Sequence, residues 1–311
     1  MPSPFLGHSR RLLSSYALAL TSLSRSISWN SSGRTQQTLA SSVTRSGTAL
    51  HSGNFTTVRL IPAAAGEGRY FVVRNLHSRK GTRIPASIDH VVSSALCTTL
   101  CRDGVRVRTV EHVLSALEAC GVDNCRIEID GGEEVPLLDG SAKQWVEAIK
   151  EAGLYVANDH NGCSLEKLVP KLHEPLYLWH GNSFLIAFPS PKIYITYGIH
   201  FSKIMKDGLQ VEGMRRAGLI KGGSVDNAIV CSATAGWLNP PLRFCDEPCR
   251  HKVLDLVGDV SLFAQNGNQG LPIAHIIAYK AGHALHTDFV RLLSRSPTAP
   301  SERLATEKLA Q

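Results

Sequence analysis

Two patterns of hydrophobic residues divide the first half of the chain into strands and helices. Apolar and polar residues alternate from Leu39 to Leu60, with Gly47 and Gly53 at turn positions, which predicts a β-hairpin. Apolar residues spaced by three and four from Thr109 to Ala119 predict a helix with Thr109 as its N-cap. The other elements predicted here are strands at Tyr70–Val73 and Cys125–Ile129 and a helix at Ser141–Ala152 that Gly153 ends.

The second half repeats this arrangement after a polar, turn-rich stretch at 154–168, which we interpret as a linker. Its predicted elements are strands at Phe184–Phe188, Ile193–Ile199 and Ile273–Tyr279 and a helix at Glu247–Phe263. Each half pairs a His-bearing helix with a following strand, which indicates duplication of an α+β unit. We therefore predict domains at 37–158 and 159–293, followed by a flexible tail at 294–311.

Residues 1–36 differ in composition from the rest of the chain. They are rich in Ser and Arg and contain no acid, which is typical of an organelle transit peptide, and we call them the leader. We expect a mitochondrial protein, with the plastid as the alternative location, and a disordered tail as the other interpretation of the leader. No apolar run approaches the roughly 18 residues that a membrane span needs.

The overall charge is explained mostly by the same end of the chain. Lys and Arg number 33 and Asp and Glu 26, for a net charge of +7, and six arginines precede Glu67, the first acidic residue. The remainder is close to neutral, so we expect no nucleic-acid partner. With 43% hydrophobic and 19% charged residues, the chain of 311 residues can form packed cores, and we expect a monomer.

The eight cysteines do not form the framework of a small secreted protein, because the chain is long and carries a transit-like leader. We expect them to be buried free thiols. The alternative is a structural zinc site built from Cys245, Cys249 and His251, although the spacing of the two cysteines is wider than the usual pair.

Several residues with catalytic chemistry fall at helical spacing. His251, Asp255 and Asp259 lie one turn apart along the predicted helix, so that the first two can reach one metal ion. Glu111 and His112 would add a third ligand and a carboxylate able to act as a general base. His283 follows a predicted strand closely. Taken singly, these residues also fit a solvated helical ion pair or a first-turn acid, and His51 fits a turn.

Taken together, six short blocks in order give a more specific result. They are Thr109-Val110-Glu111-His112, Gly121-Val122-Asp123-Asn124, Leu138-Asp139-Gly140-Ser141-Ala142, Gly222-Gly223-Ser224, Arg250-His251-Lys252 with Asp255 and Gly258-Asp259, and Lys280-Ala281-Gly282-His283-Ala284. From Gln37 to Leu292 the chain resembles the UDP-3-O-acyl-N-acetylglucosamine deacetylases, zinc enzymes that commit bacteria to lipid A synthesis.

The resemblance implies an α+β fold of two similar domains packed face to face, with the active site between them. It implies Zn²⁺ as cofactor, a UDP-linked acylated glucosamine as substrate and release of acetate by hydrolysis of the N-acetyl group. The implied roles are zinc ligation by His112, His251 and Asp255, general base for Glu111, amine protonation for His283 oriented by Asp259, and substrate contacts for Lys252 and Lys280.

One departure from the family pattern follows the predicted strand at Ile193–Ile199. Members of the family have a longer segment there with a Thr-Phe-Gly stretch, whose Thr helps to stabilise the oxyanion, and this chain lacks it. Losing one oxyanion donor commonly costs ~10²–10³ in rate. The alternative function is therefore a catalytically impaired, truncated relative that binds zinc or a nucleotide sugar without turnover.

Overall fold

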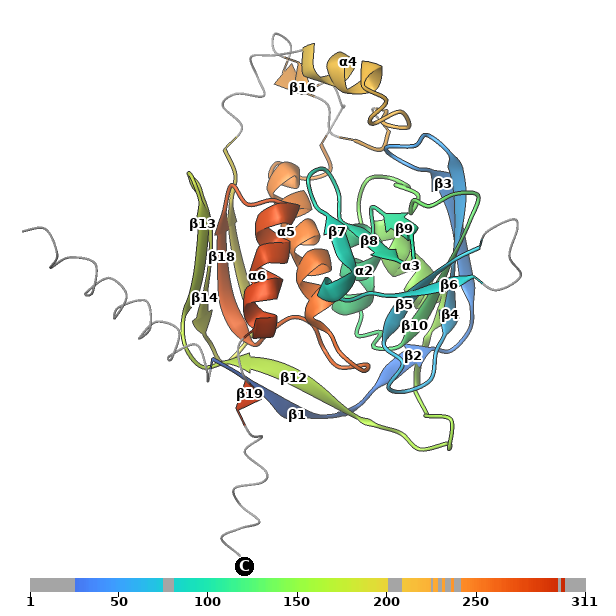
Figure 1. Cartoon of the computed structure of the whole chain (residues 1–311), viewed down its shortest axis with the longest axis vertical. Helices are drawn as coiled ribbons and strands as arrows, with labels where there is room; N and C mark the ends of the chain where they lie inside the picture. The colour runs from blue at the N-terminus through green and yellow to red at the C-terminus, as the bar shows by residue number, and fades with distance from the viewer. Residues whose placement is uncertain are drawn as a thin grey trace, which may run out of the picture.

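The computed structural model describes residues 26–74, 81–200, 209–224, 226–228, 231–232, 236–237, 242–295 and 298–299. These residues form an α+β fold in which two sheets enclose a central group of helices (Figure 1). The predictions for residues 1–25, and for most of the predicted tail at 294–311, fall outside the described residues.

The first sheet has the strand order β3-β4-β10-β5-β6. Its strands are β3 (Val43–Thr48), β4 (Phe55–Pro62), β10 (Cys125–Asp130), β5 (Arg69–Val73) and β6 (Thr82–Pro85). β3 and β4 form the predicted hairpin, β10 lies antiparallel to β4 and parallel to β5, and β6 pairs antiparallel with the outer edge of β5. The alternating residues of the central strands point into a core that includes Leu60, Phe71 and Ile127.

The second sheet repeats the same connections with one strand fewer among the described residues. Its order is β13-β14-β18-β15, from β13 (Leu176–His180), β14 (Ser183–Pro189), β18 (Ala274–Tyr279) and β15 (Tyr194–Gly198). β18 is antiparallel to β14 and parallel to β15, as β10 is to β4 and β5. No described strand occupies the position beyond β15 that β6 fills in the first sheet. This shared order of connections is compatible with the duplication predicted from sequence, and the predicted domain boundaries stay a prediction.

Two pairs of helices lie between the sheets (Figure 1). They are α2 (Glu111–Ala119) and α3 (Lys143–Ala152) on the first sheet and α5 (Glu247–Val260) and α6 (His283–Arg295) on the second. α2 and α5 approach closely at Gly258, where an added Cβ would lie 2.1 Å from the backbone oxygen of Glu111. This glycine lets the two helices that carry most of the predicted site pack backbone to backbone.

Shorter elements connect these layers. The remaining strands are β1 (Ile27–Thr35), β2 (Gln37–Leu39), β7 (Val91–Ser93), β8 (Thr99–Arg102), β9 (Val105–Arg108), β11 (Leu154–Val156), β12 (Glu166–Leu172), β16 (Cys231–Ser232), β17 (Gly236–Trp237) and β19 (Thr298–Ala299). The remaining helices are α4 (Leu209–Arg216) and the 3-10 turns η2 (Ile88–His90) and η4 (Ser261–Phe263). No helix of the described chain is long and apolar enough to cross a membrane.

Two local predictions are wrong. Thr109 is not the N-cap of α2, because its backbone is left-handed, with φ of 57°, and its hydroxyl donates to Glu134 Oε1 at 3.1 Å. The stretch at 154–168 is not a plain linker, because its two ends form β11, paired with β2, and the start of β12, paired with β1. Only its centre is a turn, which Asp159 stabilises by accepting the N–H groups of Asn161 and Cys163.

β1 is formed by residues that sequence composition had placed in the leader. It pairs antiparallel with β12 and parallel with β19, and Ile27 is 1% exposed in the core. The ring of Trp29 stacks on Phe263 with centroids 5.3 Å apart. Residues 26–35 are thus part of the folded body. The extent of the leader within 1–36 stays a prediction.

Candidate metal-dependent active site

Three predicted metal ligands from two helices converge at the interface between the halves. His112 lies in the first turn of α2, and His251 and Asp255 lie one turn apart on α5. The Nε2 atoms of His112 and His251 are 3.8 Å and 3.5 Å from Asp255 Oδ1. One ligand atom from each residue lies within 4.8 Å of the others, as binding to one ion requires.

This geometry fits a zinc ion. Ligand atoms at about 2.0 Å from a tetrahedral zinc lie roughly 3.3 Å from one another, so 3.5 and 3.8 Å are close to that spacing and too long for hydrogen bonds. Asp255 Oδ1 is buried and has no hydrogen-bond partner among the described residues, a costly state that a cation would relieve. His251 is the open side of the group, with 34% of its side chain exposed against 5% for His112.

The charges of the three residues also suit a metal. Burial lowers the pKa of His112 to about 3, and burial likewise lowers the pKa of His251. Burial alone would raise the pKa of Asp255, but His251 and Lys252 hold it below its usual value. Near neutral pH the site therefore presents two neutral imidazoles and one carboxylate, the forms that bind metal.

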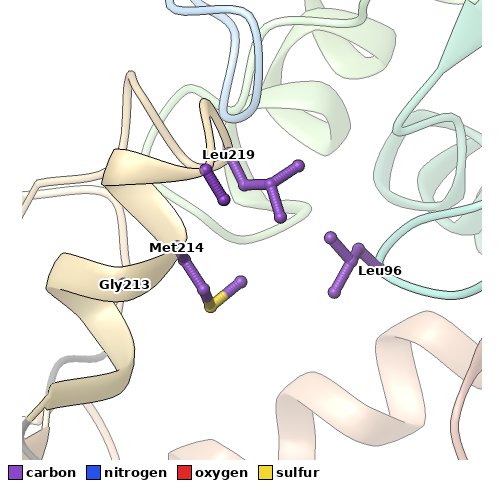
Figure 2. A pocket seen from close by; sticks show the side chains of 5 residues that line it. Leu96, Gly213, Met214 and Leu219 are labelled. Atoms are coloured by element: carbon purple, nitrogen blue, oxygen red, sulfur yellow. The ribbon is translucent and has the colours of Figure 1, made fainter.

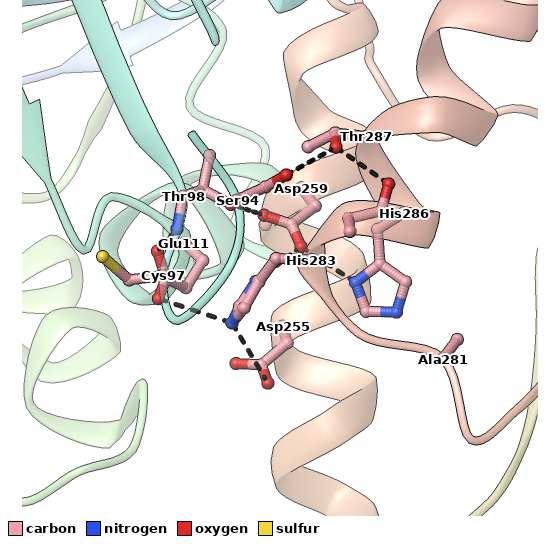
Figure 3. A network of polar contacts seen from close by, with 12 residues as sticks. Ser94, Cys97, Thr98, Glu111, Asp255, Asp259, Ala281, His283, His286 and Thr287 are labelled. Atoms are coloured by element: carbon pink, nitrogen blue, oxygen red, sulfur yellow. Dashed lines mark hydrogen bonds and ion pairs between the residues drawn. The ribbon is translucent and has the colours of Figure 1, made fainter. Parts of the chain in front are cut away.

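Glu111 lies beside this group and is held at one oxygen. The backbone N–H of Thr98 donates to Glu111 Oε2 at 3.1 Å, which leaves Oε1 3.8 Å from His283 Nε2 (Figure 3). Burial raises the pKa of Glu111 to about 8, although the positive charge of His283 acts to lower it. A carboxyl group that titrates near neutral pH is suited to accept and return a proton.

His283 is oriented by a buried carboxylate. Its Nδ1 lies 2.8 Å from Asp259 Oδ2, while Nε2 faces Glu111 and lies 3.9 Å from Asp255 Oδ2 (Figure 3). Burial would lower the pKa of His283, but Asp259 and Glu111 together raise it to about 10. The imidazolium therefore directs an N–H toward the space that Glu111 also faces. His283 is the first residue of α6 and does not stand on a loop.

The two predicted substrate lysines occupy different surroundings. Lys252 is partly exposed, and its ammonium donates to Asp255 Oδ2 at 2.6 Å. It therefore holds the carboxylate oxygen that His112 and His251 do not face. Lys280 lies at the end of β18, and its ammonium is 5.4 Å from the ring centroid of Tyr279. The substrate contacts of both lysines stay predictions.

The alternative zinc site with cysteine ligands has no support among the described residues. The two groups able to hold a metal are His112 with His251 and Asp255, and Asp259 with His283 and His286, and neither contains a cysteine. Cys249 instead directs its thiol to the backbone oxygen of Tyr197 at 3.1 Å. The seven cysteines whose side chains the structure describes are free, as expected, but of these only Cys97 and Cys125 are buried.

Sequence reasoning missed two residues that complete the site. The hydroxyl of Thr98 donates to Asp259 Oδ1 at 2.5 Å, and the Nδ1 atom of His286 lies 2.8 Å from Asp259 Oδ2 (Figure 3). No sequence pattern around Thr98 could have identified it, because it reaches Asp259 across the interface between the halves. His286 is three residues after His283, and this helical spacing was a usable signal. His51 lies in a turn, as expected, with its backbone N–H donating to Glu134 Oε1.

Comparison with known families gives one match across most of the described chain. The family described as UDP-3-O-acyl N-acetylglycosamine deacetylase matches residues 36–211 and 208–295. The two matched pieces meet shortly after β15, where the sequence lacks the segment containing Thr-Phe-Gly. The match thus includes all of the residues that converge at the site.

Individual relatives agree with the family match. A protein of Arabidopsis thaliana named probable UDP-3-O-acyl-N-acetylglucosamine deacetylase 1, mitochondrial, is 51% identical over 304 residues, covering 87% of this chain and 91% of its own length. UDP-3-O-acyl-N-acetylglucosamine deacetylases of Thermosynechococcus vestitus and Trichormus variabilis are 42% and 43% identical, covering 84% of this chain and 94% and 99% of their own lengths. The 304 aligned positions exceed the residues that 87% of this chain supplies, so the Arabidopsis protein has positions that this chain lacks.

Proposed function

The chain belongs to the UDP-3-O-acyl N-acetylglycosamine deacetylase family, and we propose that it hydrolyses the N-acetyl group of a UDP-linked, 3-O-acylated N-acetylglucosamine with the help of zinc. One observation carries the proposal. Glu111 and His283 face the same space beside His112, His251 and Asp255, with Glu111 Oε1 and His283 Nε2 3.8 Å apart. A metal site, a base and an acid are the groups that amide hydrolysis needs.

His112, His251 and Asp255 would hold the zinc ion. When bound, zinc supplies Lewis acidity that activates water at neutral pH and polarises an amide carbonyl. Lys252 keeps Asp255 ionised and leaves Oδ1 directed at the two imidazoles. The exposed side of the site, at His251, is the direction from which the acetamido group would enter.

The protein's own residues would move the protons of the reaction. Glu111 takes a proton from the attacking water through Oε1, because Thr98 holds its other oxygen. His283 gives its Nε2 proton to the departing amine as the carbon–nitrogen bond breaks, which releases acetate and a free amino sugar. Asp259 keeps the His283 ring in place and stabilises its charge throughout.

An apolar pocket offers room for the acyl chain of the substrate. Its volume is about 530 Å³, and the side chains of Leu96, Met214 and Leu219 point into it from opposite sides (Figure 2). Leu96 is two residues from Thr98, so the pocket opens beside the loop that braces Glu111. If the acyl chain lies there, Met214→Glu raises KM for the acylated substrate and leaves KM for a substrate without that chain unchanged.

The diphosphate of the substrate requires cations, and we propose Lys252 and Lys280 for this role. Neither is fully buried. Lys252 lies on α5 beside His251, and Lys280 lies between β18 and His283, the first residue of α6. The reaction would serve lipid A-type biosynthesis. We propose the mitochondrion as its location, since the Arabidopsis relative is named mitochondrial and residues 1–25 retain the composition of a leader. Imaging a fluorescent fusion of the full chain tests the location.

Acetate release from the acylated UDP sugar by the zinc-loaded chain tests the function. Glu111→Gln keeps the size of the side chain and the ligands but removes the base, so we expect activity to fall by ~10²–10⁴ with zinc content unchanged. A loss of zinc together with activity would assign Glu111 a structural role.

The impaired relative is the alternative function, which the named relatives do not favour, and one feature of the chain keeps it open to test. No described strand fills the position beyond β15, where the family match is broken and the Thr-Phe-Gly segment is absent. In this case the chain binds zinc and the UDP sugar but releases no acetate, and inserting a segment with the Thr-Phe-Gly of the family pattern after β15 restores turnover.

A further inference from the structure

The outward surface of the second sheet is aromatic. Along β13, β14, β18 and β15 alternate residues point toward α5 and α6, and the residues between them point away from the helices, on the open side of the sheet in Figure 1. The outward positions carry six aromatic side chains, which we call the aromatic face: Tyr177, Trp179, Phe184, Phe188, Tyr194 and Tyr279.

These side chains lie in contact across neighbouring strands. Trp179 is opposite Phe184, which in turn is opposite Tyr279, and the rings of Phe184 and Tyr279 have centroids 5.7 Å apart. Tyr177 and Trp179 stack with centroids 5.5 Å apart. Tyr177, Trp179 and Tyr194 are nevertheless 60%, 62% and 51% exposed, so the face is open to solvent.

The equivalent surface of the first sheet has a different chemistry. On its central strand β10, Arg126 pairs with Glu128, which also accepts from Arg74 at 2.5 Å. At its edge, Arg83 pairs with Glu67 at 3.0 Å and covers the ring of Tyr70. Two sheets of the same topology therefore differ in their outward surfaces, since one is covered by ion pairs and the other exposes aromatic rings. The fold itself does not require the aromatic face.

The four strands of the aromatic face carry no acid, and Glu174, just before β13, is the nearest acid in sequence. Residues 175–200 and 273–280, which contain the four strands, include no Asp or Glu and only two charged residues, Lys192 and Lys280. An exposed apolar patch without acids is suited to a surface that is negative and partly apolar. Trp and Tyr have apolar rings with polar tips and collect at the boundary between lipid headgroups and acyl chains.

We propose that the aromatic face docks on the surface of an anionic lipid bilayer. Tyr177, Trp179 and Tyr194 enter the headgroup region, and Lys192 contacts anionic headgroups. A second copy of the chain fits this face less well, because a symmetric pair would bring like-charged lysines together and no acid on the four strands would neutralise them. Docking does not depend on the proposed function. If that function holds, docking would bring the active site close to where an acylated substrate resides.

Binding of the full chain to vesicles tests the proposal. Phosphatidylcholine vesicles with and without phosphatidylglycerol are mixed with the chain and separated by flotation. We expect binding that requires phosphatidylglycerol and falls by roughly tenfold or more in Trp179→Ser/Tyr194→Ser, and by less in Lys192→Gln. The matched control is Phe55→Ser/Tyr155→Ser, which removes two rings of similar exposure, 68% and 63%, on the other half of the molecule. The control should bind as the unchanged chain does.

The basic leader can itself bind anionic lipid, so a local measurement completes the experiment. The emission of Trp179 is obtained as the difference between the unchanged chain and Trp179→Phe. Brominated lipids should quench this emission when the chain is bound. Absence of vesicle binding, bound chain with unquenched Trp179, or equal binding of the two double variants would overturn the proposal. So would light scattering that shows a dimer which Trp179→Ser/Tyr194→Ser dissociates, since a second copy would then cover the face.

Discussion

Two carboxylates a few ångströms from the same imidazole are held in opposite states. Asp255 is kept ionised by His251 and Lys252, although burial alone would raise its pKa. Glu111 has a single backbone donor on Oε2, and burial raises its pKa to about 8. Asp255, which is ionised, suits a metal ligand, whereas Glu111, which titrates near neutral pH, suits a group that accepts and returns a proton. This division of roles follows from the partners of each residue and not from its type.

The raised pKa values of Glu111 and His283 predict how the stability of the metal-free protein depends on pH. The pKa of His283 is raised from 6.5 to about 10. The stabilisation that its protonated form adds to the free energy of unfolding is therefore complete below pH 6.5 and is lost as pH rises through about 10. The pKa of Glu111 is raised from 4.5 to about 8, so its contribution is complete below pH 4.5 and is lost as pH rises through about 8. Thermal unfolding should therefore occur at a lower temperature at pH 9 than at pH 6.5.

His283→Gln is the control for this measurement, because it removes one of the two titrations and should make the dependence shallower. Added zinc should raise the unfolding temperature through binding to the folded state. An unfolding temperature that stays constant or rises between pH 6.5 and pH 9 would contradict the assigned environments of Glu111 and His283.

The sequence pattern could place residues of the candidate site that share one helix, but it could not identify residues that act across the interface. The stripe of His251, Asp255 and Asp259 could be predicted because helical spacing fixes it. The link from Thr98 to Asp259 joins residues 161 positions apart, and no local pattern encodes it. Thr109 has the right type for an N-cap, but its hydroxyl has a partner in Glu134 that only the folded chain brings near.

At the scale of elements, the position of Glu111 depends on how closely α2 and α5 pack. An added Cβ at Gly258 would lie 2.1 Å from Glu111 O, and this neighbour is backbone that cannot rotate away. We expect Gly258→Ala to destabilise the protein by about 1–3 kcal/mol in urea unfolding, as overpacking in a core does, and to weaken zinc binding because α2 carries His112.

Gly213→Ala in α4 is the matched control, since a Cβ there meets nothing within 4 Å. Replacing a helical glycine by alanine without steric conflict should leave stability unchanged or raise it by up to about 1 kcal/mol. If Gly258→Ala is equally harmless, the close approach of the two helices does not position Glu111.

Strand predictions depended on where the pairing partner lies. The β3–β4 hairpin could be predicted because its partners are neighbours in sequence. β1 was missed because its composition is that of the leader and its partner, β12, lies more than a hundred residues away. The stacking of Trp29 on Phe263, which helps to fix β1, is likewise a long-range contact.

At the scale of the whole molecule, duplication gives two sheets of like topology and one site between their helices. The first half supplies His112 and Glu111, and the second supplies His251, Asp255 and His283. Neither half alone holds all three of His112, His251 and Asp255, so zinc binding at this group should report on the assembled interface. The halves then diverge on their outer surfaces, in the aromatic face and in the position beyond β15.

The central claim is that one zinc ion, held between the halves, makes this chain a deacetylase. Zinc titrated into the metal-free full chain, with acetate release from the acylated UDP sugar measured at each point, tests it most directly. We predict that activity rises in proportion to added zinc and reaches a plateau at one zinc per chain, with Asp255→Ala showing neither tight binding nor activity. A chain that binds one zinc and releases no acetate would contradict the claim and favour the impaired relative.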